Sequence, residues 1–131
     1  MKTYELVLNK QQTIVISKAL ELLSRIHMGQ FSEIRNLFIK SINMQEALEI
    51  EKIIKDKIYP NLGGTGHYGI TSKEINEDAR VAWDIQQEIR YKISWNENPN
   101  ENPNGGFGVN FDEPLWTSKS EHRPKLKINN D

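Results

Sequence analysis

The sequence contains no cysteine, has almost no net charge and includes no long hydrophobic run. Without cysteine, the chain forms no disulfide and offers neither a thiolate metal ligand nor a thiol nucleophile. Seventeen basic residues nearly balance eighteen acidic ones, so no global field attracts DNA or an anionic membrane, and any anion site is local. No apolar run reaches the roughly 20 residues that span a bilayer, and the first residues, with an acidic Glu5, do not resemble a signal peptide. The composition predicts a cytoplasmic protein.

Apolar residues at helical spacing predict four helices. Asn9 followed by Gln12, and Asn43 followed by Glu46, have the residue types of a capping box, which marks the start of a helix. Pro60 ends the third helix. The predicted helices span about residues 10–27, 32–40, 44–58 and 76–94. On the first helix, the apolar residues predicted to face the core are Ile16, Ala19, Leu20, Leu23 and Ile26.

Three short segments have the alternation or the composition of strands. They are residues 3–8, 107–111 and 125–128. With the four helices they predict a single α+β domain over residues 1–131, with a small, mostly antiparallel sheet. The tandem Asn-Glu-Asn-Pro repeat has no apolar content, so residues 96–106 are predicted to form a mobile loop. A polar stripe on the fourth helix is interpreted as a solvated face: Arg80, Asp84, Gln87 and Tyr91.

Nothing in the sequence indicates catalysis or a metal. The three histidines, His27, His67 and His122, do not have the spacing of a metal site. No Gly-x-Ser-x-Gly elbow is present, and the glycine-rich stretch at 63–69 lacks the Lys-Ser/Thr ending of a phosphate loop. The prediction is therefore a protein that is not an enzyme and has no cofactor.

The end of the first helix is the first candidate ligand site. Arg25 lies where the chain turns, and Gly29 is the residue type that closes a helix in the left-handed conformation. A guanidinium at such a turn suits a phosphate or a carboxylate, and Gln30 belongs to the same run. The alternative is a surface arginine near a helix C-terminus, where cations are mildly favoured.

The second candidate site combines residues from the later part of the chain. Alternation along a strand places Asn110 and Asp112 on one face, where an amide and a carboxylate can bind ribose hydroxyls and base edges. Arg123 and Lys125 supply local positive charge for a pyrophosphate, and Tyr68 supplies a ring for stacking. The alternative is an exposed strand in which Asp112 begins the turn at Pro114.

Four stretches together carry a resemblance to a known family: ALELLSRIHMGQF (19–31), GHYGI (66–70), ARVAWDIQQEIR (79–90) and VNFDEPL (109–115). In overall texture they resemble the type 1 Thoeris anti-defence proteins of phages. The resemblance covers most of the chain except the Asn-Pro repeat and the extreme C-terminus. None of its motifs is a catalytic signature.

The resemblance implies a sponge that acts in the cytoplasm of the infected host cell. Members of that family bind and sequester the cyclic ADP-ribose isomers that TIR-domain enzymes make, without cleaving them. Some members also bind cyclic oligonucleotides at a separate site, and the family forms homo-oligomers, from dimers to hexamers. Arg25 and the Asn110/Asp112 pair match pocket positions, and either Arg123 or Lys125 matches the C-terminal cation. The duplicated Asn-Glu-Asn-Pro looks like an insertion relative to the family.

Two other functions remain open. A phage-encoded inhibitor that binds a host protein needs an exposed apolar or acidic surface, for which Trp83, Trp95 and Trp116 are candidates, although tryptophan is more often part of a core. A small cyclic-nucleotide hydrolase needs a cluster of histidine and aspartate in space.

Overall fold

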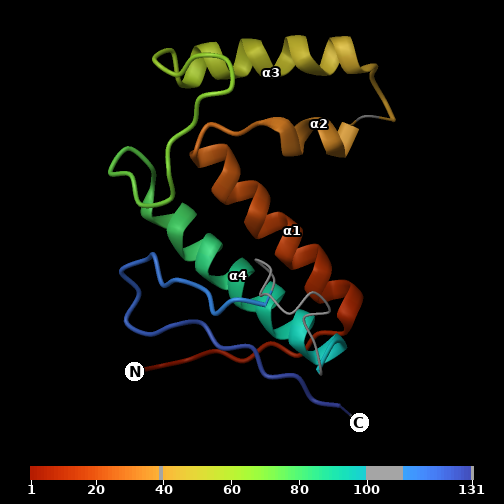
Figure 1. Cartoon of the computed structure of the whole chain (residues 1–131), viewed down its shortest axis with the longest axis vertical. Helices are drawn as coiled ribbons and strands as arrows, with labels where there is room; N and C mark the ends of the chain where they lie inside the picture. The colour runs from red at the N-terminus through yellow and green to blue at the C-terminus, as the bar shows by residue number, and fades with distance from the viewer. Residues whose placement is uncertain (39, 100–110, 131) are drawn as a thin grey trace.

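The structure, a computed structural model, describes residues 1–38, 40–99 and 111–130. The helices there are α1 Lys10–His27, α2 Ser32–Phe38, α3 Met44–Ile58 and α4 Glu77–Glu97. Helices α1 and α4 lie side by side and form a body, whereas α2 and α3 pack on each other as an arm at the end of α1 (Figure 1). Lys10 at the start of α1 pairs with Glu97 at the end of α4, so the two body helices run antiparallel.

The starts of α1 and α3 confirm the predicted capping boxes. The Asn9 side chain accepts a hydrogen bond from the Gln12 N–H at 2.9 Å, and the Gln12 side chain accepts one from the Asn9 N–H at 2.9 Å. Asn43 and Glu46 repeat this exchange at 2.9 and 3.3 Å. Each box satisfies N–H groups that have no partner within the first turn of a helix. None of the described helices is long and apolar enough to cross a membrane.

Gly29 closes α1 in the way that the sequence predicts. Its φ is +85°, in the left-handed region. The Gly29 N–H donates to the Ile26 carbonyl at 3.0 Å and the Gln30 N–H donates to the Arg25 carbonyl at 2.8 Å, which together form a Schellman motif. A Cβ at Gly29 would lie 2.7 Å from Leu62 Cδ1. Glycine is therefore required here both by the backbone and by the space.

The two body helices approach each other through small residues. Ser24, Ala79 and Ala82 are buried, and the Ser24 hydroxyl donates to the Ala79 carbonyl at 2.9 Å. Small side chains let the helix backbones come close, and the hydroxyl then finds a backbone acceptor on the facing helix. The predicted apolar stripe is wrong in part, because Ala19 and Leu23 are exposed.

The predicted sheet is wrong, and the described part of the chain is all-α. Residues 3–8 and 125–128 form no strand, and residues 107–110 lie outside the described ranges. Alternation makes a strand only where a partner accepts its backbone hydrogen bonds. Val7 is 92% exposed and packs on no sheet, and the Leu126 N–H bonds to the Glu88 carboxylate at 3.0 Å instead of to a strand. Of the predicted loop, residues 96 and 97 form the last turn of α4, and residues 100–106 are not described.

Candidate functional site

A groove of about 330 Å³ lies between α4 and residues 111–130, which we call the C-terminal segment. This volume is at the lower end of the range for small-molecule sites. One wall of the groove is α4. The other wall is the C-terminal segment, which lies along α4 and forms neither a helix nor a strand. The lining has two aromatic rings and three cations: Tyr91, Trp116, Lys92, Arg123 and Lys125. It also has three carboxylates, of which Asp84 and Glu88 accept backbone N–H groups of the C-terminal segment and Glu113 pairs with Arg123.

Asp84 fixes the C-terminal segment to the helix. Its carboxylate accepts hydrogen bonds from the Thr117 N–H at 2.9 Å, the Thr117 hydroxyl at 2.7 Å and the Ser118 N–H at 2.9 Å. Asp84 is only 4% exposed, and the nearby Gln87 is 8% exposed. The polar stripe on α4 was predicted to be a solvated face, and this prediction is wrong for both residues. Asp84 holds the C-terminal segment, whereas Gln87 bonds to Gln86 and Arg90 of α4 itself.

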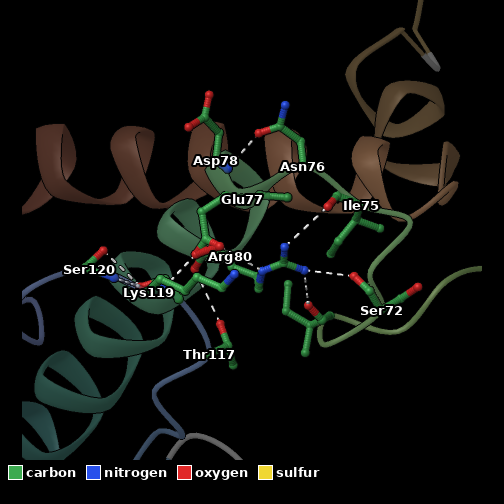
Figure 2. A network of polar contacts seen from close by, with 12 residues as sticks. Ser72, Ile75, Asn76, Glu77, Asp78, Arg80, Thr117, Lys119 and Ser120 are labelled. Atoms are coloured by element: carbon green, nitrogen blue, oxygen red, sulfur yellow. Dashed lines mark hydrogen bonds and ion pairs between the residues drawn. The ribbon is translucent and has the colours of Figure 1, made fainter.

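A second set of polar contacts lies at the start of α4, where Arg80 joins residues 70–75 to the helix (Figure 2). Its guanidinium donates to the Ser72 carbonyl at 2.8 Å and to the carbonyls of Ile70 and Ile75 at 3.3 Å each. It also pairs with Glu77 at 3.2 Å. Arg80 therefore ties the end of the glycine-rich loop to α4.

Glu77 extends this network to the C-terminal segment. Its second oxygen accepts the Lys119 N–H at 2.7 Å (Figure 2). This backbone hydrogen bond lowers the pKa of the Glu77 carboxyl, and the Arg80 guanidinium lowers it further. Both effects favour the ionised carboxylate. Ionised Glu77 thus helps to hold the segment that forms one wall of the groove.

The cations of the groove differ in how far they are neutralised. Arg123 pairs with Glu113 at 3.3 Å and donates to the Pro114 carbonyl at 2.7 Å. Lys92 and Lys125 are exposed and form no ion pair with any residue in the described ranges. Two lysine charges therefore remain available beside the aromatic rings.

Two of the predicted site residues, Arg25 and Gln30, meet at the end of α1. Arg25 donates to the Gln30 side chain at 2.7 Å and to Glu21 at 2.9 Å. Neither lines the groove. Arg90 of α4 belongs to the same neighbourhood: burial lowers the pKa of its guanidinium, Glu21 raises it and Arg25 lowers it. The end of α1 therefore holds two guanidinium groups and one carboxylate.

The other predicted residues have different outcomes. Arg123 and Lys125 both line the groove. Tyr68 packs against the buried Met28, and its N–H donates to the Met28 carbonyl at 2.9 Å, so its ring belongs to the hydrophobic core. Asp112 is exposed and lies outside the lining, and Asn110 is not among the described residues.

Tyr91, Lys92 and Trp116 are groove residues that the sequence did not identify as nucleotide-binding residues, although Trp116 was a candidate for a protein-binding surface. One sequence signal could have identified Tyr91. It lies on the polar stripe of α4 that was predicted to face solvent, one turn after Gln87 and two turns after Asp84. The position of Trp116 depends on the bonds that Asp84 makes with Thr117, which no local pattern predicts.

No group of three or more histidine, aspartate or glutamate residues in the described ranges is arranged to hold a metal ion. Comparison of the chain with models of protein families, with curated proteins and with solved structures finds no match.

Proposed function

We propose that the chain is a binding protein for a phosphate-bearing nucleotide, which it takes up in the groove along α4. The observation that supports this proposal is the combination of two aromatic rings with two lysines that have no ion-pair partner in the described structure. Following the family resemblance, the proposed ligand is a cyclic ADP-ribose isomer that is sequestered without cleavage in the host cytoplasm. The same resemblance predicts self-association.

Each kind of side chain in the groove suits one part of such a ligand. Trp116 and Tyr91 offer ring faces or edges to a base, and stacking on an aromatic ring contributes about 1–3 kcal/mol per base. Lys92 and Lys125 offer point charges to a pyrophosphate, and Arg123 turns part of its charge toward Glu113. A ligand with a base and two phosphates therefore uses both features at once.

Arg25, Gln30 and Tyr68 are not needed for this proposal. They lie outside the lining of the groove, and Tyr68 already has a role in the core. The proposed contribution of Asn110 and Asp112 to sugar recognition stays a prediction. Two residues, Arg123 and Lys125, match the C-terminal cation of the family. We favour Lys125, because Glu113 partly neutralises the charge of Arg123.

Calorimetry with a cyclic ADP-ribose isomer tests the proposal. Lys125→Ala and Trp116→Ala should each weaken binding about tenfold or more, since each removes an interaction of about 1.5 kcal/mol or more. The control is Lys18→Ala, an exposed lysine on α1 that does not line the groove, and it should bind like the parent protein. Equal binding by all three variants and the parent would contradict the groove assignment.

A second measurement distinguishes sequestration from the two other functions. The protein is incubated with the nucleotide, and free and protein-bound nucleotide are separated by filtration. The retained fraction is then denatured by heat, and both fractions are analysed by chromatography. Recovery of the intact nucleotide from the retained fraction supports a sponge, and a cleaved product in either fraction indicates a hydrolase. A nucleotide that never leaves the free pool contradicts nucleotide binding and favours an inhibitor that binds a host protein.

A further inference from the structure

A second cavity lies in the arm, between α2 and α3 (Figure 1), and we call it the arm pocket. Its volume is about 270 Å³. Most of its wall is apolar and consists of Ile34, Phe38, Ile42, Ala47, Ile50 and Ile54. Ala47 is buried, whereas Phe38 and Ile50 are about half exposed. The arm pocket therefore has a buried floor and a mouth that opens to solvent.

One ion pair belongs to this apolar wall. Arg35 of α2 and Glu51 of α3 both line the arm pocket, and Arg35 Nη1 lies 3.5 Å from Glu51 Oε2. This separation exceeds the usual length of an N–H···O hydrogen bond, about 2.7–3.2 Å. Glu51 Oε2 is buried and accepts no hydrogen bond from any residue that the structure describes. Buried carboxylate oxygens are normally hydrogen-bonded, so this one indicates a donor that the described chain does not supply.

The ion pair determines the charge of the ligand that fits. A cation would meet Arg35, an anion would meet Glu51, and either would lose its hydration among apolar side chains. A neutral hydroxyl or N–H group avoids both costs and can donate to Glu51 Oε2, while the rest of the ligand contacts the apolar wall. One or two polar groups in an otherwise apolar cavity are typical of small-molecule sites.

The volume sets the size of this ligand. A cavity of about 150 Å³ that is lined by leucine, isoleucine and phenylalanine stays dry and binds benzene. At about 270 Å³, the arm pocket has room for two fused aromatic rings or a hydrocarbon of similar size. A nucleotide is a poor match, because the only cation of the lining, Arg35, is already paired with Glu51.

We propose that the arm pocket binds a small, neutral, mostly apolar molecule whose single hydrogen-bond donor is directed to Glu51. Such a ligand covers apolar side chains that are exposed in the free chain and satisfies the buried carboxylate oxygen. Because it contacts both α2 and α3, it also stabilises their packing by mass action. The arm pocket shares no lining residue with the groove along α4, so the proposal does not depend on nucleotide binding.

An NMR titration of the full chain with indole tests the proposal, with the isoleucine methyl groups labelled with ¹³C. Indole is neutral, consists of two fused rings and has one N–H donor. The methyl groups of Ile34, Ile50 and Ile54 should shift and saturate with a dissociation constant of about 1 mM or lower. The methyl group of Ile89, which is buried on α4, should not shift. In 1-methylindole a methyl group replaces the N–H donor, so this compound should bind at least about tenfold more weakly.

Glu51→Met removes the acceptor and keeps the approximate length of the side chain. The preference for indole over 1-methylindole should then fall below about threefold, because neither compound finds an acceptor at this position. The matched control is Glu49→Met, since Glu49 is an exposed residue of α3 that does not line the arm pocket. This control should keep the preference of the parent chain.

Three results would overturn the proposal: no saturable shift of the pocket methyl groups, equal affinity of the parent chain for the two compounds, or a preference that persists in Glu51→Met. The comparison of the two compounds on the parent chain needs no variant, so it decides even if Glu51→Met does not fold. Pocket methyl groups that shift on dilution of the protein and not with indole would assign the pocket to a second copy of the chain and overturn the proposal as well.

Discussion

Gly29 shows how one residue connects the body to the arm. Its left-handed φ of +85° ends α1 and turns the chain toward α2. The space beside it is filled by Leu62, which follows α3. The orientation of the arm therefore depends on the absence of a side chain at this position.

Gly29→Ala should lower the free energy of unfolding by about 1–2 kcal/mol, because an L-residue with a side chain is strained in the left-handed region. The added Cβ would also lie 2.7 Å from Leu62 Cδ1. Urea denaturation followed by circular dichroism measures the change. Gly64→Ala is the control, since its φ is not positive and a Cβ there meets nothing within 4 Å, and it should be close to neutral. Equal effects of the two substitutions would contradict this explanation.

The carboxylates of α4 do at the residue scale what a neighbouring strand would do in a sheet. Glu77, Asp84 and Glu88 each accept a backbone N–H of the C-terminal segment. The carboxylate side chains accept the hydrogen bonds that a neighbouring strand would otherwise accept. An extended segment can therefore pack on a helix without leaving its buried N–H groups unpaired.

Asp84→Asn should detach part of the C-terminal segment. The carboxylate accepts three hydrogen bonds with its two oxygens, whereas an amide presents a donor to one of these N–H groups. Loss of a buried acceptor costs about 1–3 kcal/mol. Trypsin should then cleave more rapidly after Lys119 and Lys125.

Asp112→Asn is the matched control for that substitution. Asp112 is exposed and makes no hydrogen bond with the residues in the described ranges, so the control should keep the stability and the cleavage rate of the parent. Nucleotide binding should weaken in Asp84→Asn as well, because the wall that carries Trp116 is released. Unchanged cleavage of Asp84→Asn would contradict the role of Asp84 as an anchor.

At the scale of whole elements, the helices could be predicted because their signals are local. Asn9 and Asn43 cap helices through residues three positions away, and Gly29 ends a helix through its own φ. The sheet could not be predicted correctly, since alternation in residues 3–8 does not reveal whether a partner strand exists. The sequence predicted only part of the groove for the same reason. Tyr91 and Trp116 are brought together by contacts between residues that are far apart in the sequence.

The junction between α4 and the C-terminal segment should depend on pH. The pKa of Glu77 is lowered in the folded chain, first by the Lys119 N–H and then by Arg80. The stabilisation from its ionised form is therefore fully present above the pKa that glutamate has in the unfolded chain, and it is lost as the pH falls through the lower, folded pKa.

Denaturation at several pH values between 7 and 3 measures this effect, and Glu77→Gln should lose part of the acid dependence. Glu49→Gln on α3 is a suitable control, because that carboxylate is exposed and, among the described residues, bonds only to the Gln45 side chain. An acid dependence that is identical in Glu77→Gln and in the parent would show that Glu77 contributes nothing to it.

At the scale of the whole molecule, the body and the arm differ in how well they are packed. The body buries Ser24, Ala79 and Ala82 between two long helices. The arm buries Ala47 on α3 and no residue on α2. Local opening requires less free energy where few apolar contacts are lost, so the two parts should open independently.

Amide hydrogen exchange followed by mass spectrometry makes this difference measurable. Peptides from α1 and α4 should be protected most strongly, close to the global free energy of unfolding, and peptides from α3 should exchange earlier. Protection of α3 that equals that of α4 would contradict this difference, because it would mean that the arm opens only together with the body.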